Sequence, residues 1–161
     1  MASSQSASLF YKAESLKKAF KAKNVLKDAK VWQKLVEFVD VNKALLLTDL
    51  DYALEKKAEV DLWNVAFKEV ISGLQSEAAN SRLLNKNVNL GWFLDFASGF
   101  YVLLLQEICM AYDLDLPFLR SASFYGVNLD KDVDVIKKCN NVNNINYICA
   151  HCLVHLGDLA R

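Results

Sequence analysis

The sequence has little glycine, proline or arginine and no excess of either charge. Five glycines and one proline in 161 residues leave few turn signals, which favours long helices. Nineteen basic residues balance nineteen acidic ones, so bulk charge gives no reason to expect binding to nucleic acid or to a membrane. Only three of the basic residues are arginines, namely Arg82, Arg120 and Arg161. Recognition of an anion would therefore have to be local.

Targeting signals and a disulfide framework are also lacking. The first residues contain neither a basic segment nor an apolar one, which argues against a secretory signal, and no arginine precedes Arg82 to form a mitochondrial presequence. The four cysteines, Cys109, Cys139, Cys149 and Cys152, do not have the pattern of a small secreted domain. We therefore expect a reducing compartment and a cytoplasmic protein.

Apolar residues at helical spacing run through most of the chain and predict an all-α domain, an antiparallel bundle of about five helices. Hydrophobic content of 53% is sufficient for a core in one domain, residues 1–161. The expected helices are 8–22, begun by Ser8, then 29–53, 54–79 (continuous with the second or kinked from it), 90–112, and one from 141–144 to the end, where asparagines can cap it. Residues 113–140 are expected to form a mobile loop.

The segment 90–112 is apolar almost all round and is long enough to raise the question of a membrane span. Asp95, Gln106 and Glu107 argue against a span, because charged and polar groups are costly at membrane depth. A central, buried helix of the bundle is the preferred interpretation.

Two basic residues lie at the edges of apolar helix stripes. Lys68 borders the stripe of Trp63, Ala66, Phe67, Val70 and Leu74, and at 100° per residue Asn64 and Gln75 share its polar side. Arg161 ends the last helix, with Asp158 one turn before it. Two cations held by packed helices would form a phosphate site, since the arginine fork can bind two oxygens. Judged by spacing alone, ordinary helix-surface charges are the preferred interpretation of Lys68 and Arg161.

The sequence gives weaker support for a metal site or a catalytic site. Cys149, His151, Cys152 and His155 have zinc-ligand types, but all lie on one short helical segment, so core packing is preferred and no metal is predicted. No nucleophile with a partner base, and no glycine-rich phosphate loop, is recognisable, so neither an enzyme nor a cofactor is expected. Asp49, Asp51 and Asp61 are expected to be surface charges.

Gly99 interrupts the apolar run of the fourth helix. A glycine inside a helix costs about 1 kcal/mol, which the close approach of another helix would offset. That helix could belong to this domain or to a partner, so Gly99 is a candidate interface residue.

Three separate blocks, residues 46–68, 97–101 and 147–161, carry a family likeness. They resemble the N-terminal 14-3-3-like domain of the Smg-five, Smg-six, Smg-seven and Est-one family, and the Smg-seven branch most. The resemblance implies a fold with tetratricopeptide-type helix pairs and binding to phosphoserine segments of the phosphorylated Upf-one RNA helicase. It further implies nonsense-mediated mRNA decay, in cytoplasm with shuttling to the nucleus as an option, a Smg-five-like heterodimer partner, and decay factors recruited through a C-terminal region that is absent here.

Carried over onto this sequence, the resemblance makes Lys68 and Arg161 the phosphate-binding residues, with Asn64, Gln75 and Asp158 in support. The 14-3-3 pocket has a second arginine seven residues after its lysine, where this chain has Gln75. Two cations in place of three imply weaker phosphate affinity. The chain also stops at Arg161 inside an apparent helix, so we expect the front part of a longer domain.

Two alternatives stay open beside the phosphoserine adaptor. One is a helical scaffold that pairs with a partner through apolar surface and reads no phosphate. The other is an Est-one-type, telomerase-associated role.

Overall fold

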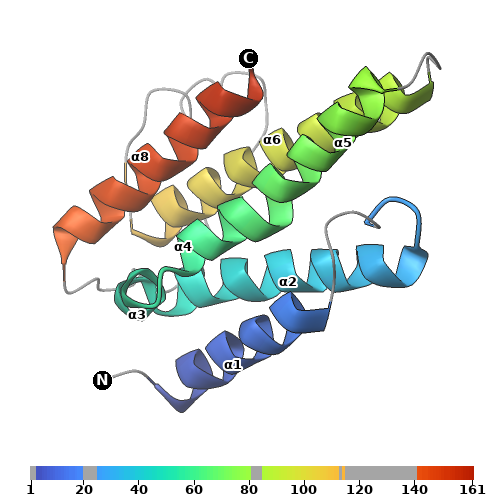
Figure 1. Cartoon of the computed structure of the whole chain (residues 1–161). Coiled ribbons are helices and arrows are strands. Elements are labelled where there is room, and N and C mark those ends of the chain that lie inside the picture. The colour runs from blue at the N-terminus through green and yellow to red at the C-terminus, as the bar shows by residue number, and fades with distance from the viewer. Residues whose placement is uncertain (1–2, 20–24, 81–84, 113, 115–140) are drawn as a thin grey trace. The chain divides into compact units, whose positions relative to one another are not determined.

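A computed structural model describes residues 3–19, 25–80, 85–112, 114 and 141–161 (Figure 1). The described residues form helices, turns and caps without a strand, which confirms the all-α prediction. The chain divides into two compact units, residues 1–99 and residues 100–161. The loop expected at 113–140 lies outside the described residues except for Leu114, whose amide donates to the Cys109 carbonyl at 2.8 Å.

Most helices belong to the first unit. In chain order they are α1 (Ser4–Ala19), α2 (Ala29–Thr48), α3 (Leu50–Glu55), α4 (Ala58–Asp61), the π-helix η2 (Leu62–Lys68), α5 (Glu69–Ala79) and α6 (Asn85–Ala111), which continues into the second unit. The second unit adds α8 (Val142–Leu159).

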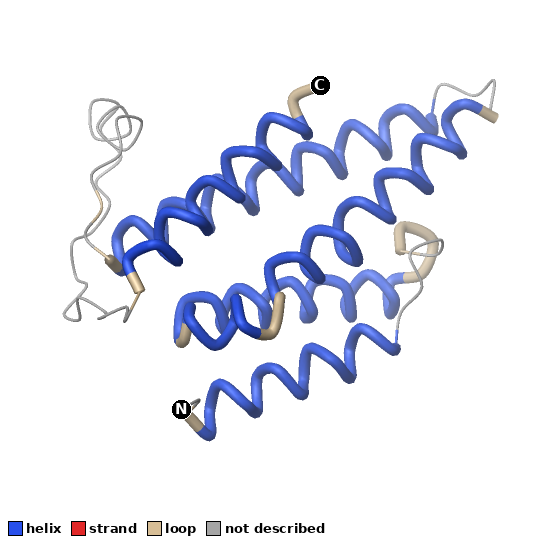
Figure 2. Tube along the Cα trace, turned by 60° about the vertical axis from the view of Figure 1, so that its left-hand side comes forward, coloured by secondary structure: helices blue, strands red, loops and turns tan. Residues whose placement is uncertain are grey.

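Helices α1 and α2 pack side by side, as Figures 1 and 2 show. An ion pair joins them, with Lys12 Nζ 2.7 Å from Glu37 Oε1. The predicted start of α1 at Ser8 is wrong, since the helix begins at Ser4. The physical reason is Ser3, whose hydroxyl oxygen accepts the Ser6 amide at 3.1 Å and so begins the helix earlier.

The two long helices expected over 29–79 are divided into shorter segments. Asp49 ends α2 and caps α3, because its carboxylate accepts the Tyr52 amide at 3.1 Å. The same carboxylate accepts the Ser6 hydroxyl of α1 at 3.1 Å, so Asp49 also ties two helices together. Lys57 then has a left-handed φ of 57°, which ends one helical direction before α4 begins. Asp49 is therefore a half-buried structural cap, where an ordinary surface charge was expected.

Aromatic rings fill the core of the first unit. Phe67 of η2 lies with its ring centroid 6.3 Å from that of Phe93 and 6.2 Å from that of Phe96, both on α6. Trp32 of α2 lies 5.1 Å from Phe96. Because Phe67 and Phe93 are fully buried, this cluster fixes η2 against α2 and the first part of α6.

Helix α6 contains a stretch, Val88–Ala111, that is long and apolar enough to cross a membrane by length and composition, with mean hydropathy 1.5. The core helix of a soluble protein meets the same criterion. We keep the interpretation of a bundle helix, because Phe93 and Ala97 are buried. The helix is only partly buried, although a central, buried helix was expected, since Trp92 is 50% exposed and Leu103 is 44% exposed.

The last helix begins as the sequence predicts. Asn141 caps α8 by accepting the Asn143 amide at 3.0 Å. In the second unit, α8 packs on the C-terminal part of α6, where the rings of Tyr101 and His155 lie 5.7 Å apart.

Candidate functional site

Lys68 ends the π-helix η2, and Asn64 lies close to one turn before it. Hydrogen bonds in η2 span five residues rather than four, so the Glu69 amide donates to the Asn64 carbonyl. π turns are rare and occur often at functional sites, where the wider turn redirects side chains. The periodicity of the sequence had predicted an ordinary α-helix here.

The apolar stripe expected beside Lys68 is confirmed. Ala66, Phe67, Val70 and Leu74 are buried and Trp63 is half-buried. Since these side chains face the core, Lys68 remains at the edge of the stripe with its side chain exposed.

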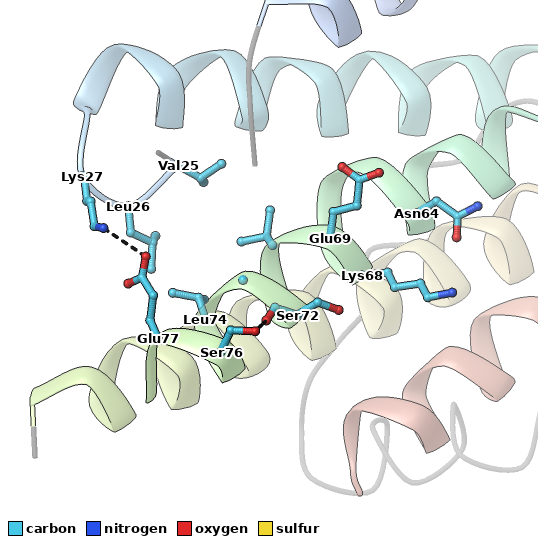
Figure 3. Close-up of a pocket in the computed structure, with 12 residues that line it drawn as sticks. Val25, Leu26, Lys27, Asn64, Lys68, Glu69, Ser72, Leu74, Ser76 and Glu77 are labelled. Carbon is cyan, nitrogen blue, oxygen red and sulfur yellow. Dashed lines mark hydrogen bonds and ion pairs between the residues drawn. The ribbon is translucent and has the colours of Figure 1, made fainter. Parts of the chain in front are cut away.

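A cavity of about 1090 Å³ opens beside Lys68 (Figure 3). One side is the turn before α2, which supplies Val25, Leu26 and Lys27, and the other runs from Asn64 in η2 to Glu77 in α5. Buried Val25, Val70 and Leu74 make its floor apolar. The cavity therefore combines an apolar floor with a polar rim.

Four charged side chains line the rim, two of them basic and two acidic. Lys27 Nζ lies 3.0 Å from Glu77 Oε1, and this ion pair spans one end of the cavity (Figure 3). Lys68 and Glu69 also line it, and within the described ranges neither makes an ion pair. Lys68 is thus available to bind an anion.

Neutral polar groups flank Lys68. Figure 3 shows Asn64, Lys68 and Ser72 projecting to the same side, as their spacing of four residues requires. Ser72 was not identified from the sequence, although that spacing could have found it. Gln75 is exposed and does not line the cavity, so its supporting role stays a prediction.

Arg161 follows the end of α8 and is held loosely by Asp158. Its Nη2 lies 3.4 Å from Asp158 Oδ1, which confirms the contact expected one turn apart. The other carboxylate oxygen, Oδ2, lies 3.6 Å from His155 Nδ1. Burial lowers the pKa of His155, while the nearby Asp158 carboxylate acts in the opposite direction.

Lys68 belongs to the first unit and Arg161 to the second. Their convergence on one phosphate therefore stays a prediction. The part of the candidate site that the structure describes is the cavity beside Lys68.

Gly99 lies exposed on α6. A Cβ added there would meet no atom of the described chain within 4 Å. The first explanation for this glycine, close approach by another helix of the same domain, is therefore not supported among the described residues. The partner interface remains open.

The cysteine and histidine group on α8 packs into the protein. Cys149, Cys152 and His155 are buried and His151 is half-buried. Within the described part of the chain, no three His, Cys, Asp or Glu side chains are placed to hold a metal ion.

Comparison with known proteins adds a family to this geometry. The family described as telomerase activating protein Est1 matches residues 57–161, a range that includes both Lys68 and Arg161. The chain is 45% identical over 154 residues to a protein of Danio rerio named nonsense-mediated mRNA decay factor SMG7. That alignment covers 92% of this chain and 13% of the Danio rerio protein.

Proposed function

Because the chain belongs to the Est1 family, to which the SMG5, SMG6 and SMG7 proteins also belong, we propose that it binds phosphoserine segments of the Upf-one RNA helicase. The family is one of adaptors related to nonsense-mediated mRNA decay. The observation that carries the proposal is Lys68, an exposed cation without an ion pair in the described ranges, at the rim of a large cavity.

The chemistry of a phosphoserine suits this rim. The phosphate carries close to two negative charges near neutral pH and offers three acceptor oxygens. The ammonium of Lys68 can donate to them, and the Asn64 amide and Ser72 hydroxyl on the same side add neutral donors. In this proposal the guanidinium of Arg161, oriented by Asp158, supplies the second cation and binds two oxygens at once.

The cavity also accepts more than the phosphate. Its volume of about 1090 Å³ is much larger than one phosphate group, and its floor is apolar. Residues next to the phosphoserine would therefore bury apolar side chains over Val70 and Leu74.

Titration calorimetry with matched phosphorylated and unphosphorylated helicase peptides tests the proposal. We expect binding of the phosphorylated form only, and loss of that binding in Lys68→Glu. Lys34→Glu is a matched control, because Lys34 is an exposed lysine of α2 that does not line the cavity. Equal affinity for both peptides would refute a phosphate-reading site.

A scaffold that pairs with a Smg-five-like partner is the second candidate, and Gly99 favours it. Val88, Trp92 and Gly99 share one face of α6 by spacing, and all three are exposed. Gly99→Glu would place a charge on that face, at a position where an added Cβ meets no atom of the described chain within 4 Å. Loss of partner co-purification in this variant, with phosphopeptide binding intact, would support the scaffold. Co-purification of telomerase RNA would favour an Est-one-type role.

We propose binding, without catalysis, as the role of this segment, in the cytoplasm and with shuttling to the nucleus. Recruitment of decay factors is assigned to parts of the protein beyond this chain. Immunofluorescence with and without a block of nuclear export tests the localisation.

A further inference from the structure

A glycine lies on the part of α5 that lines the cavity beside Lys68. Gly73 is half-buried and inside the helix, although glycine is among the least favourable residues in a helix interior. Apart from its neighbours along the helix, no atom of the described chain lies within 4 Å of a Cβ added at Gly73. The missing side chain therefore leaves a notch in the wall of the cavity.

The surroundings of this notch are apolar on one side and acidic along the helix. Val70 and Leu74, which are 2% and 9% exposed, belong to the apolar floor next to Gly73. Glu69 and Glu77 lie one turn before and one turn after Gly73, and in Figure 3 they lie toward opposite ends of the cavity. Of these two carboxylates, that of Glu77 is already paired with a lysine at 3.0 Å.

Burial of an apolar side chain is the larger of the two effects that this notch can offer to a ligand. Glu69 is exposed, and an ion pair with an exposed carboxylate contributes little because water and salt screen it. Removal of a leucine-sized side chain from water changes an affinity by about tenfold or more. The notch therefore favours a bulky apolar occupant over a charged one.

The distance from Lys68 sets where this occupant lies in a bound segment. At 1.5 Å per residue, Gly73 is about 7.5 Å from Lys68 along the helix axis. At 100° per residue the two positions also face sides of the helix about 140° apart, which lengthens the path between them. An extended segment advances about 3.3 Å per residue, so the occupant lies about three to five residues from the phosphoserine.

We propose that Gly73 forms a subsite for a bulky apolar side chain of the bound segment and so determines which phosphoserine segments the protein selects. This inference rests on the proposed function of the Lys68 rim. The phosphate on Lys68 fixes the position of the segment, and the notch at Gly73 then reads the size and polarity of one further residue. A glycine suits this role because any larger residue would fill the space that the ligand needs.

Titration calorimetry of the full-length protein with a series of helicase phosphopeptides tests the proposal. Each position two to six residues from the phosphoserine, on either side, carries leucine, asparagine, lysine or alanine in turn. We expect one position at which leucine binds about tenfold more tightly than alanine. Asparagine, which has nearly the shape of leucine but is polar, should bind there as alanine does.

Glycine variants connect this preference to the notch. Gly73→Ala should raise the midpoint of thermal unfolding, because alanine favours a helix and its methyl group meets open space in the described chain. It should nevertheless reduce the preference for leucine to less than about threefold, because the methyl group occupies the notch. Gly91→Ala is the matched control, since Gly91 is an exposed glycine of α6 with the same open space and does not line the cavity. It should raise the midpoint and keep the preference.

The outcomes separate this inference from the proposed function. Phosphate-dependent binding without a leucine preference, a full preference in Gly73→Ala, or a position that favours lysine over leucine would each overturn the subsite and leave the phosphate site standing. A leucine preference shared equally by the unphosphorylated peptides would refute phosphate reading and support the notch. Absence of binding by every peptide would overturn both.

Discussion

The Lys17 ammonium of α1 lies 2.7 Å from the Asp61 carboxylate of α4. Both side chains are about a third exposed, and the contact joins residues 44 apart in the sequence. The pair holds α1 against the residue that directly precedes the π-helix η2. A surface ion pair thus has an architectural role beside the candidate site.

Removal of this ion pair should destabilise the protein slightly and in a pH-dependent way. The hydrogen bond that Lys17 donates to Asp61 raises the pKa of Lys17. The stabilisation is therefore present below the ordinary lysine pKa and is lost as the pH rises through the higher folded-state pKa. We expect Lys17→Met to lower the free energy of unfolding by about 0.5 kcal/mol at pH 7. The difference should disappear once the pH exceeds the folded-state pKa of Lys17. Urea unfolding at several pH values measures it, with Lys18→Met as control.

Charge reversal at Lys68 should weaken phosphopeptide binding strongly. A hydrogen bond to a charged group contributes about 1.5–3 kcal/mol, so Lys68→Glu should cost at least about 10- to 100-fold in affinity. Lys34→Glu should change the affinity less than about twofold, because Lys34 is exposed and does not line the cavity. Both variants are measured by titration with the same phosphopeptide. Similar losses in both would indicate a general charge effect.

Truncation of Phe67 should remove much of the stability of the first unit. This ring is fully buried and faces Phe93 and Phe96. Phe67→Ala should lower the free energy of unfolding by about 3–5 kcal/mol, the usual cost of a large cavity. Tyr11→Ala, at a ring that is 70% exposed, should cost less than about 1 kcal/mol. Chemical denaturation of both variants would show whether the core lies where the aromatic contacts place it.

Gly99→Ala should stabilise the chain. A methyl group at this position meets open space in the described chain, and alanine favours a helix over glycine by about 1 kcal/mol. We expect the midpoint of thermal unfolding to rise. A fall would mean that another helix does approach Gly99 closely, and would return the glycine to a packing role.

The helical class of the fold could be predicted from the sequence because apolar spacing is local information. Asn141 capped the last helix as expected, and the buried stripe of Ala66, Phe67, Val70 and Leu74 followed from periodicity. The division of the long helices could not be read the same way. Apolar residues continue across Asp49, so only its capping bond, which depends on the folded backbone, ends α2 there.

The candidate site could be predicted only in part. Lys68 and Asn64 lie within one stretch of sequence, and their shared face follows from helical spacing. The cavity forms only when Leu26 and Lys27 lie against Glu77. The ion pair between Lys27 and Glu77 joins residues that are 50 apart in the sequence. The π-helix η2 could not be predicted from the sequence either. Apolar residues spaced three and four apart are compatible with one extra residue in a single helical turn.

The balance of charge around the cavity has a kinetic consequence. Lys27 and Lys68 offset Glu69 and Glu77, so the field of these four groups nearly cancels beyond a Debye length of about 8 Å. A phosphorylated segment would reach this rim by ordinary diffusion, at about 10⁵ to 10⁷ M⁻¹s⁻¹, with little acceleration at low ionic strength. Discrimination between phosphorylated segments would then depend on the dissociation rate of each bound segment.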